Sequence, residues 1–122
     1  MAALAAQPSS LIVTSGVELE NALKNEAVQE IKIGNNIDCF GSLEIKRPVT
    51  IDGNHLDLEM WNTITILSDD VTIKNLNIYG KQSEDDGLHI LCVGNYVGNY
   101  ESAPKNILIE NCLLCGHWRG ET

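Results

Sequence analysis

One pattern of alternating residues is written three times in this chain, at residues 49–56, 71–80 and 107–116. Each copy has Val or Ile, an Ile two positions later, a charged residue, Gly or Asn, and then a second alternating run. The first two copies lie 22 residues apart and the last two lie 36 apart. A period of about 20 to 30 residues built from short strands is typical of a solenoid, in which each turn buries its apolar side only against neighbouring turns.

The residue after the charged position is Gly53, Asn75 or Asn111 in the three copies. A sharp bend between two strands requires a backbone near the left-handed region, which Gly and Asn tolerate best. We therefore expect these residues to make equivalent bends. Stacked Asn side chains can also hydrogen-bond from one turn to the next. The alternative is that each Asn is only a surface turn residue.

Alternate residues of a strand point to opposite faces, so the alignment separates inward from outward side chains. The inward columns are Val49/Val71/Ile107, Ile51/Ile73/Ile109 and Leu56/Ile78/Leu114. The outward columns include Asp52/Lys74/Glu110 and His55/Asn77/Leu113. A further strand per turn is predicted at Leu43/Ile45, Ile64/Ile66 and Leu88/Ile90, with His89 outward.

The chain divides into four parts around these repeats. We expect an N-terminal arm at 1–10, a cap strand and helix at 11–29, the repeated turns at 30–116 with a loop insertion at 94–106, and a tail at 117–122.

The cap helix is predicted from its start signal and its apolar face. Ser15 and Glu18 have the capping-box spacing, and Leu19, Ala22 and Leu23 share one helical face. A short amphipathic helix of this kind can shield the first turn of a solenoid.

Composition limits the partners and the compartment. The formal net charge is −9, and the eight basic residues are scattered. A nucleic-acid backbone or an anionic membrane requires clustered Lys and Arg, so neither is expected as a partner. The chain shows no signal peptide and no apolar run near the roughly 18 residues of a membrane span. We expect a soluble domain of undetermined location, whether intracellular, exported without a cleavable signal, or freed from its signal.

The cysteines favour neither zinc nor a disulfide framework. Cys112 and Cys115 have the spacing of a metal half-site, but the strand alignment puts them on opposite faces, so they cannot close on one ion. Cys39, Cys92 and Cys112 are expected to be small buried apolar residues. No firm metal site is predicted from them.

The last turn, from Leu88 to Leu114, is expected to present strand edges and an apolar floor, unless Trp118 folds beneath it. We therefore predict a homo-oligomer or another partner covering this C-terminal end. The alternative is that the chain is a truncation of a longer protein.

Three segments, 71–80, 85–90 and 105–112, resemble the pectate-lyase superfamily of right-handed parallel β-helices. The first is similar to its "I-R-N-L-x-I" run, the second to an acidic "D-A-I" strand and the third to a "W-I-D-H-C" strand. The resemblance covers roughly residues 11–116. It implies an all-β fold, namely a short right-handed parallel β-helix of about three turns with an N-terminal capping helix.

The resemblance also implies a possible calcium site, because lyases of this superfamily bind calcium through carboxylates on one outer face. Asp85 or Asp86 matches the first acid, and Glu110 stands where the Asp of "I-D-H" would be. Asn111 replaces the His, and the segment that would hold the catalytic arginine is absent, since Arg119 lies in a tail that does not align. Elimination needs a base as well as carboxylates, so no catalytic residue is assigned.

These observations favour a non-enzymatic β-helical binding or structural module, such as a viral or cell-surface assembly protein that contacts carbohydrate or protein. Tyr96, Tyr100 and Trp118 offer amphipathic contact area, with His89 as a further contact candidate. Loop packing is the alternative role for these aromatic residues. The alternative function is a fragment of a calcium-dependent polysaccharide lyase or a related carbohydrate-active enzyme, with Asp85, Asp86 and Glu110 as its acids.

Overall fold

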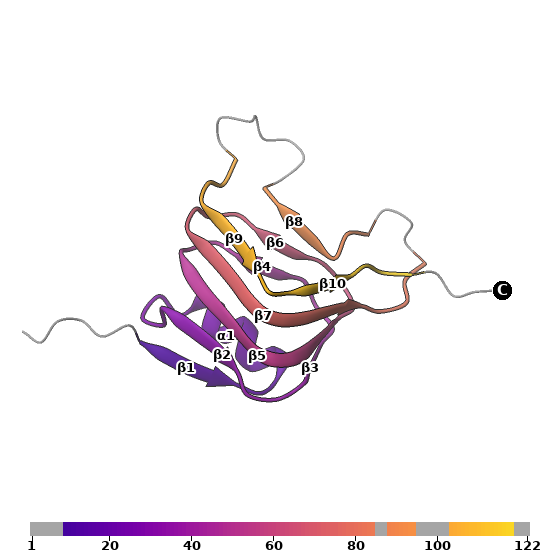
Figure 1. Cartoon of the computed structure of the whole chain (residues 1–122), viewed down its shortest axis with the longest axis horizontal. Coiled ribbons are helices and arrows are strands. Elements are labelled where there is room, and N and C mark those ends of the chain that lie inside the picture. The colour runs from indigo at the N-terminus through magenta and orange to yellow at the C-terminus, as the bar shows by residue number, and fades with distance from the viewer. Residues whose placement is uncertain (1–8, 85–87, 95–102, 119–122) are drawn as a thin grey trace, which may run out of the picture.

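The computed structural model describes residues 9–84, 88–94 and 103–118, and within these ranges parallel strands dominate and one short helix is present (Figure 1). The predicted all-β class is therefore confirmed. The elements are β1 (Ser10–Val13), α1 (Gly16–Lys24), β2 (Glu30–Ile33), β3 (Ile37–Cys39), β4 (Leu43–Ile45), β5 (Val49–Met60), β6 (Ile64–Ile66), β7 (Val71–Gly80), β8 (Leu91–Val93), β9 (Ile107–Glu110) and β10 (Leu113–Cys115). No helix in the described ranges is long and apolar enough to cross a membrane.

The chain alternates between two parallel sheets as it advances. The larger sheet has the order β1-β2-β5-β7-β10, with β3 also paired to β5 and β9 also paired to β7. The smaller sheet has the order β4-β6-β8. Figure 1 shows the strands layered in chain order, from β1 in indigo to β9 and β10 in yellow. Each inner repeat therefore pairs with the repeat before it and the repeat after it.

The predicted alignment is the observed register over the first half of each repeat. Two aliphatic rows cross β5, β7 and β9, namely Val49–Val71–Ile107 and Ile51–Ile73–Ile109. The second row continues to Ile31 of β2, which pairs with Ile51. These rows join the main hydrophobic core, in which Ile31 and Ile73 are almost completely buried.

The second half of β5 differs from the prediction by two residues. Leu56 pairs with Leu76 rather than with Ile78, whose partner is Leu58, because the register shifts between Asp52 and Leu56. The inward column is therefore Leu58/Ile78/Leu114, and the predicted outward column containing His55 is wrong.

The bend in β5 is also made by other residues than predicted. Asn54 and His55 have positive φ, at 52° and 62°, whereas Gly53 does not. Gly53 serves close packing instead, since a Cβ there would lie 2.4 Å from the carbonyl oxygen of Asn75. Asn75 and Asn111 do adopt the expected left-handed conformation, with φ of 55° and 53°.

The third strand of the smaller sheet begins later than predicted. Ile64 and Ile66 pair with Leu91 and Val93, not with Leu88 and Ile90. The connection from β7 to β8 occupies residues 81–90, whereas the one from β5 to β6 occupies only 61–63. The longer connection moves the strand three residues along the chain.

Helix α1 begins at the predicted cap. The Ser15 Oγ accepts a hydrogen bond from the Glu18 N–H at 3.2 Å. The Glu18 carboxylate accepts hydrogen bonds from the Thr14 N–H and hydroxyl at 2.7 and 3.0 Å, and the N–H bond is the main reason that its pKa lies below the ordinary value. The buried face consists of Leu19, Ala22 and Leu23, as predicted.

Arg47 fastens the end of α1 to the strands. Its guanidinium donates to the carbonyl oxygens of Ala22 at 2.8 Å, Leu23 at 2.9 Å and Val28 at 2.6 Å. The first two lie at the end of the helix, where carbonyls lack the usual partners; the Ala22 oxygen also accepts the Asn25 N–H at 3.1 Å. Partial burial is the main reason that the pKa of Arg47 is lowered from its usual value. This one side chain satisfies the helix end and holds the cap against the segment before β5.

We expect Arg47→Met to lower the free energy of unfolding by about 2 to 4 kcal/mol, because it leaves partly buried carbonyls unpaired. Arg47→Lys should recover only part of this loss, since one ammonium cannot span the three acceptors. Lys46→Met is the matched control because Lys46 is exposed and binds only Glu44 in the described chain, at 3.4 Å. Urea unfolding measures the stability of all three variants. Equal losses of stability for Arg47→Met and Lys46→Met would contradict this role of Arg47.

Candidate functional site

Four of the predicted site residues lie outside the described residues. They are Asp85 and Asp86, predicted as calcium or carbohydrate ligands, and Tyr96 and Tyr100, predicted as contact residues. Their roles remain predictions.

The other predicted residues occupy different parts of the surface. Glu110 ends β9 and pairs in register with Lys74 on the larger sheet. His89 is exposed before β8, and its carbonyl oxygen accepts a hydrogen bond from the Thr63 hydroxyl at 2.6 Å. Trp118 is 54% exposed, and its backbone bridges to the segment that follows β7. Glu110 therefore does not share the neighbourhood of the connections that hold His89 and Trp118.

An outward row of alternating charge crosses the larger sheet. Lys32, Asp52, Lys74 and Glu110 are successive partners on β2, β5, β7 and β9. Opposite charges on neighbouring strands attract one another, whereas like charges placed directly opposite destabilise a sheet. The row therefore supports the same register as the buried aliphatic rows.

Asp52 is the most strongly tethered residue of this row. Its carboxylate accepts hydrogen bonds from the Asn54 N–H at 3.0 Å and from the Asn75 side-chain amide at 3.2 Å. The Asn54 N–H is the largest reason that the pKa of Asp52 lies below its ordinary value of 3.8, and Asn75, Lys74 and Lys32 lower it further.

The asparagines of the bends stack as predicted. The side-chain amide of Asn111 donates to the side-chain oxygen of Asn75 at 2.7 Å, and Asn75 donates in turn to Asp52. This bend ladder, formed by Asp52, Asn75 and Asn111, joins three successive repeats. Each residue of the ladder therefore supports the bend of its neighbour.

Further side-chain pairs link the layers elsewhere. The Asn106 amide donates to Asp70 at 2.7 Å, and the Asn77 amide donates to Asp57 at 3.1 Å. The surface acids of the described chain thus serve to a large extent as acceptors for the neighbouring repeat.

An exposed aromatic cluster lies where the larger sheet ends and the chain turns towards the smaller one. Phe40, Trp61 and Lys81 each follow the last residue of β3, β5 or β7, and the Trp61 and Lys81 N–H groups continue the ladder. The Phe40 and Trp61 rings stack with centroids 5.6 Å apart, and the Lys81 ammonium lies 5.7 Å from the Trp61 ring centroid. With Asp38 and Glu59, which precede them, these residues form what we call the aromatic corner.

Two polar contacts of the same kind fix the aromatic corner. The Trp61 indole N–H donates to the Asp38 carboxylate at 3.1 Å, and the Lys81 ammonium pairs with Glu59 at 3.3 Å. In each case an acid near the end of one strand binds the residue that follows the neighbouring strand. Phe40 is 70% exposed and Trp61 is 40% exposed.

Sequence reasoning missed the aromatic corner because its members, two aromatic residues and a lysine, do not repeat one residue type. The signal was the spacing, since Phe40, Trp61 and Lys81 follow one another at nearly the repeat distance. The unrecognised two-residue insertion near Asn54 shifted the register of the second half of β5 by two residues and hid this column.

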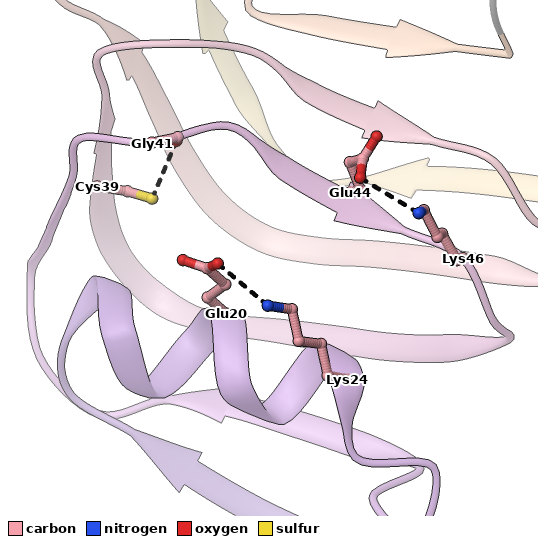
Figure 2. Close-up of polar contacts among 6 residues, drawn as sticks. All are labelled: Glu20, Lys24, Cys39, Gly41, Glu44 and Lys46. Carbon is pink, nitrogen blue, oxygen red and sulfur yellow. Dashed lines mark hydrogen bonds and ion pairs between the residues drawn. The ribbon is translucent and has the colours of Figure 1, made fainter.

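A polar groove runs between α1 and the smaller sheet (Figure 2). Its volume is about 320 Å³, and its charged lining includes the ion pairs Lys24–Glu20 and Lys46–Glu44, both at 3.4 Å. Cys39 lies beside it, donating to the Gly41 carbonyl at 3.5 Å, and burial raises the pKa of its thiol. The charges of the groove are largely paired with one another.

The described residues hold no group of three or more His, Cys, Asp or Glu side chains that could bind a metal ion. No disulfide joins the four cysteines, all of which lie in the described ranges. Cys39 is buried as predicted, whereas Cys92 and Cys112 are only partly buried. Cys112 packs against the core, and Cys115 is exposed beside Tyr79.

The fold and its surface define an all-β domain of stacked parallel strands with a helical cap. A family model described as a pectate lyase-like adhesive domain matches residues 11–112. The chain belongs to this family. No curated protein and no solved structure gives a significant match.

We expect Asp52→Asn to lower the free energy of unfolding by about 1 kcal/mol at pH 7, because the charge-assisted bonds to Asn54 and Asn75 weaken. The folded pKa of Asp52 lies below 3.8, so its contribution is present above that pH and is lost as the pH falls through the folded pKa. Urea unfolding at pH 7 and at a series of pH values below 3.8 should show the difference between wild type and variant shrinking as the pH falls. A difference that persists unchanged in acid would contradict this role.

Proposed function

We propose that this domain is a non-enzymatic adhesive module, built as a short right-handed parallel β-helix of about three turns, that binds carbohydrate or protein at a cell surface. The match to the pectate lyase-like adhesive family is the observation that carries the proposal. The alternation between two parallel sheets supports the β-helix, and crossovers between parallel strands are right-handed in about 98% of cases.

The surface chemistry also supports binding over elimination. The carboxylate of Asp52 is engaged by neighbouring amides, and Glu110 lies beside Lys74 on the sheet. Calcium needs roughly six to eight oxygen ligands, so a site here would depend on Asp85 and Asp86. Calcium binding therefore remains a prediction about residues outside the described part of the chain.

The absence of lyase activity is testable directly. We expect the domain, incubated with polyuronates in the presence and absence of calcium, to give no increase in the ultraviolet absorbance of unsaturated products. A product that appears with wild type and disappears with Glu110→Gln would overturn the non-enzymatic proposal in favour of a calcium-dependent lyase. Circular dichroism of both proteins controls for folding.

We further propose that a second copy of the chain covers the end formed by β9 and β10. Leu108, Leu113 and Leu114 are 48%, 48% and 45% exposed, and each of these strands pairs only with β7 in the described chain. Apolar side chains beside open strand edges are typical association surfaces. Leu114 also lies in the row of Ile78, on the core side of the sheet.

We expect wild type to form dimers or larger species in multi-angle light scattering at high concentration, because association buries these leucines. Leu113→Lys and Leu114→Lys should each shift the protein towards monomer. Val17→Lys is the matched control, since Val17 is 70% exposed on α1 at the other end. A wild type that stays monomeric at every concentration would contradict this association.

A further inference from the structure

We propose that the aromatic corner binds neutral pyranose sugars, with the open face of Phe40 and the exposed part of Trp61 as the platform and Asp38, Glu59 and Lys81 as hydrogen-bonding groups around it. This inference rests on the proposed adhesive function and specifies the ligand class and the site.

The platform is exposed although its side chains are large and apolar. Phe40 is 70% exposed, and one face of its ring stacks on Trp61 with an interplanar angle of 25°. One face of Phe40 therefore rests on Trp61, and the exposure of Phe40 leaves its other face as an open, flat apolar surface. A pyranose ring has one face lined with C–H groups, and such a face buries apolar area against an aromatic ring while its hydroxyls stay at the edge.

The platform is ordered before any ligand arrives. The Trp61 indole is held on its N–H by Asp38 at 3.1 Å, and Lys81 packs over its ring. Lys81 is held in turn by Glu59 at 3.3 Å. A prearranged site avoids much of the entropy cost of ordering side chains on binding.

The acids next to the platform keep hydrogen-bonding capacity. A carboxylate has about four lone-pair positions, and the described contacts of Asp38 and Glu59 leave positions for sugar hydroxyls. Lys81 has three N–H donors and can reach sugar oxygens as well as Glu59. Flat apolar surface bordered by a few polar groups is the usual composition of a small-ligand site.

Charge selects among sugars. The aromatic corner holds two carboxylates and one ammonium, and the ammonium already pairs with Glu59. The whole chain carries a formal net charge of −9. Uronic and sulfated sugars are therefore repelled, and neutral sugars are favoured. The ligand class differs from the acidic polymer on which a pectate lyase acts.

The aromatic corner also stays accessible in the proposed dimer. Phe40 and Trp61 follow β3 and β5, which β7 separates from β10. Two copies meeting at β9 and β10 therefore do not need to cover the platform.

The test is binding to immobilised neutral oligosaccharides and polyuronates, followed by titration of the best neutral ligand with tryptophan fluorescence and calorimetry. We expect binding to neutral glycans and none to polyuronates. Phe40→Ala and Trp61→Ala should each raise the dissociation constant for this neutral ligand at least tenfold. Ile12→Ala is the control, because Ile12 is a 64% exposed apolar residue on β1 outside the aromatic corner, and it should leave binding unchanged.

The outcomes separate the site from the function. Neutral-glycan binding that survives Phe40→Ala, a surface substitution, would overturn the site even where Trp61→Ala fails to fold, and it would leave the adhesive proposal standing. Binding to polyuronates alone, or to no glycan, would likewise overturn the ligand class. Only turnover of polyuronate, measured separately, would overturn the non-enzymatic function.

Discussion

The structure depends on aliphatic side chains that stack in register across parallel strands. A single repeat is too thin to bury its own apolar face, so each strand obtains its burial from the strands before and after it. Ile31, Ile51 and Ile73 show this, being 0%, 5% and 1% exposed in one row. Each fully buried side chain of this kind contributes roughly 1.5 to 3 kcal/mol. A slip of one residue would turn the whole row outward, so the register is strongly specified.

The polar groups at the bends follow the same register and reinforce it. Asp52, Asn75 and Asn111 hydrogen-bond in series, and two of them hold the left-handed backbone that the bend requires. The alternating charges of the neighbouring outward row act in the same sense. Buried stacking and surface ladders therefore select one arrangement of the layers, and Arg47 adds the helical cap to it.

The repeats were predictable from sequence because their first halves keep both residue type and spacing. Val49, Val71 and Ile107 align without knowledge of the structure, and so do the cap signals Ser15 and Glu18. The insertion in β5 was not predictable, since Gly53 offered a permissive residue at the expected bend while its actual role is close packing.

The candidate surface was less predictable than the fold. Phe40, Trp61 and Lys81 follow one another at nearly the repeat distance, but two are aromatic and one is basic, so residue type does not mark their column and the strand register is needed to align them. Of the three acids suggested by family resemblance, only Glu110 lies in the described residues, and it lies beside Lys74. Recognising a site built from different residue types requires coordinates, whereas recognising a repeated row of aliphatic residues does not.

Each layer of strands pairs only with its neighbouring layers in the described chain, and this has a mechanical consequence. In such an array, tension applied through the β9 and β10 side is resisted first by their bonds to β7, and only afterwards by the bonds of β7 to β5. Extension under force is then expected to proceed by peeling one layer after another. The domain would dissipate a pull in several small steps instead of rupturing at once.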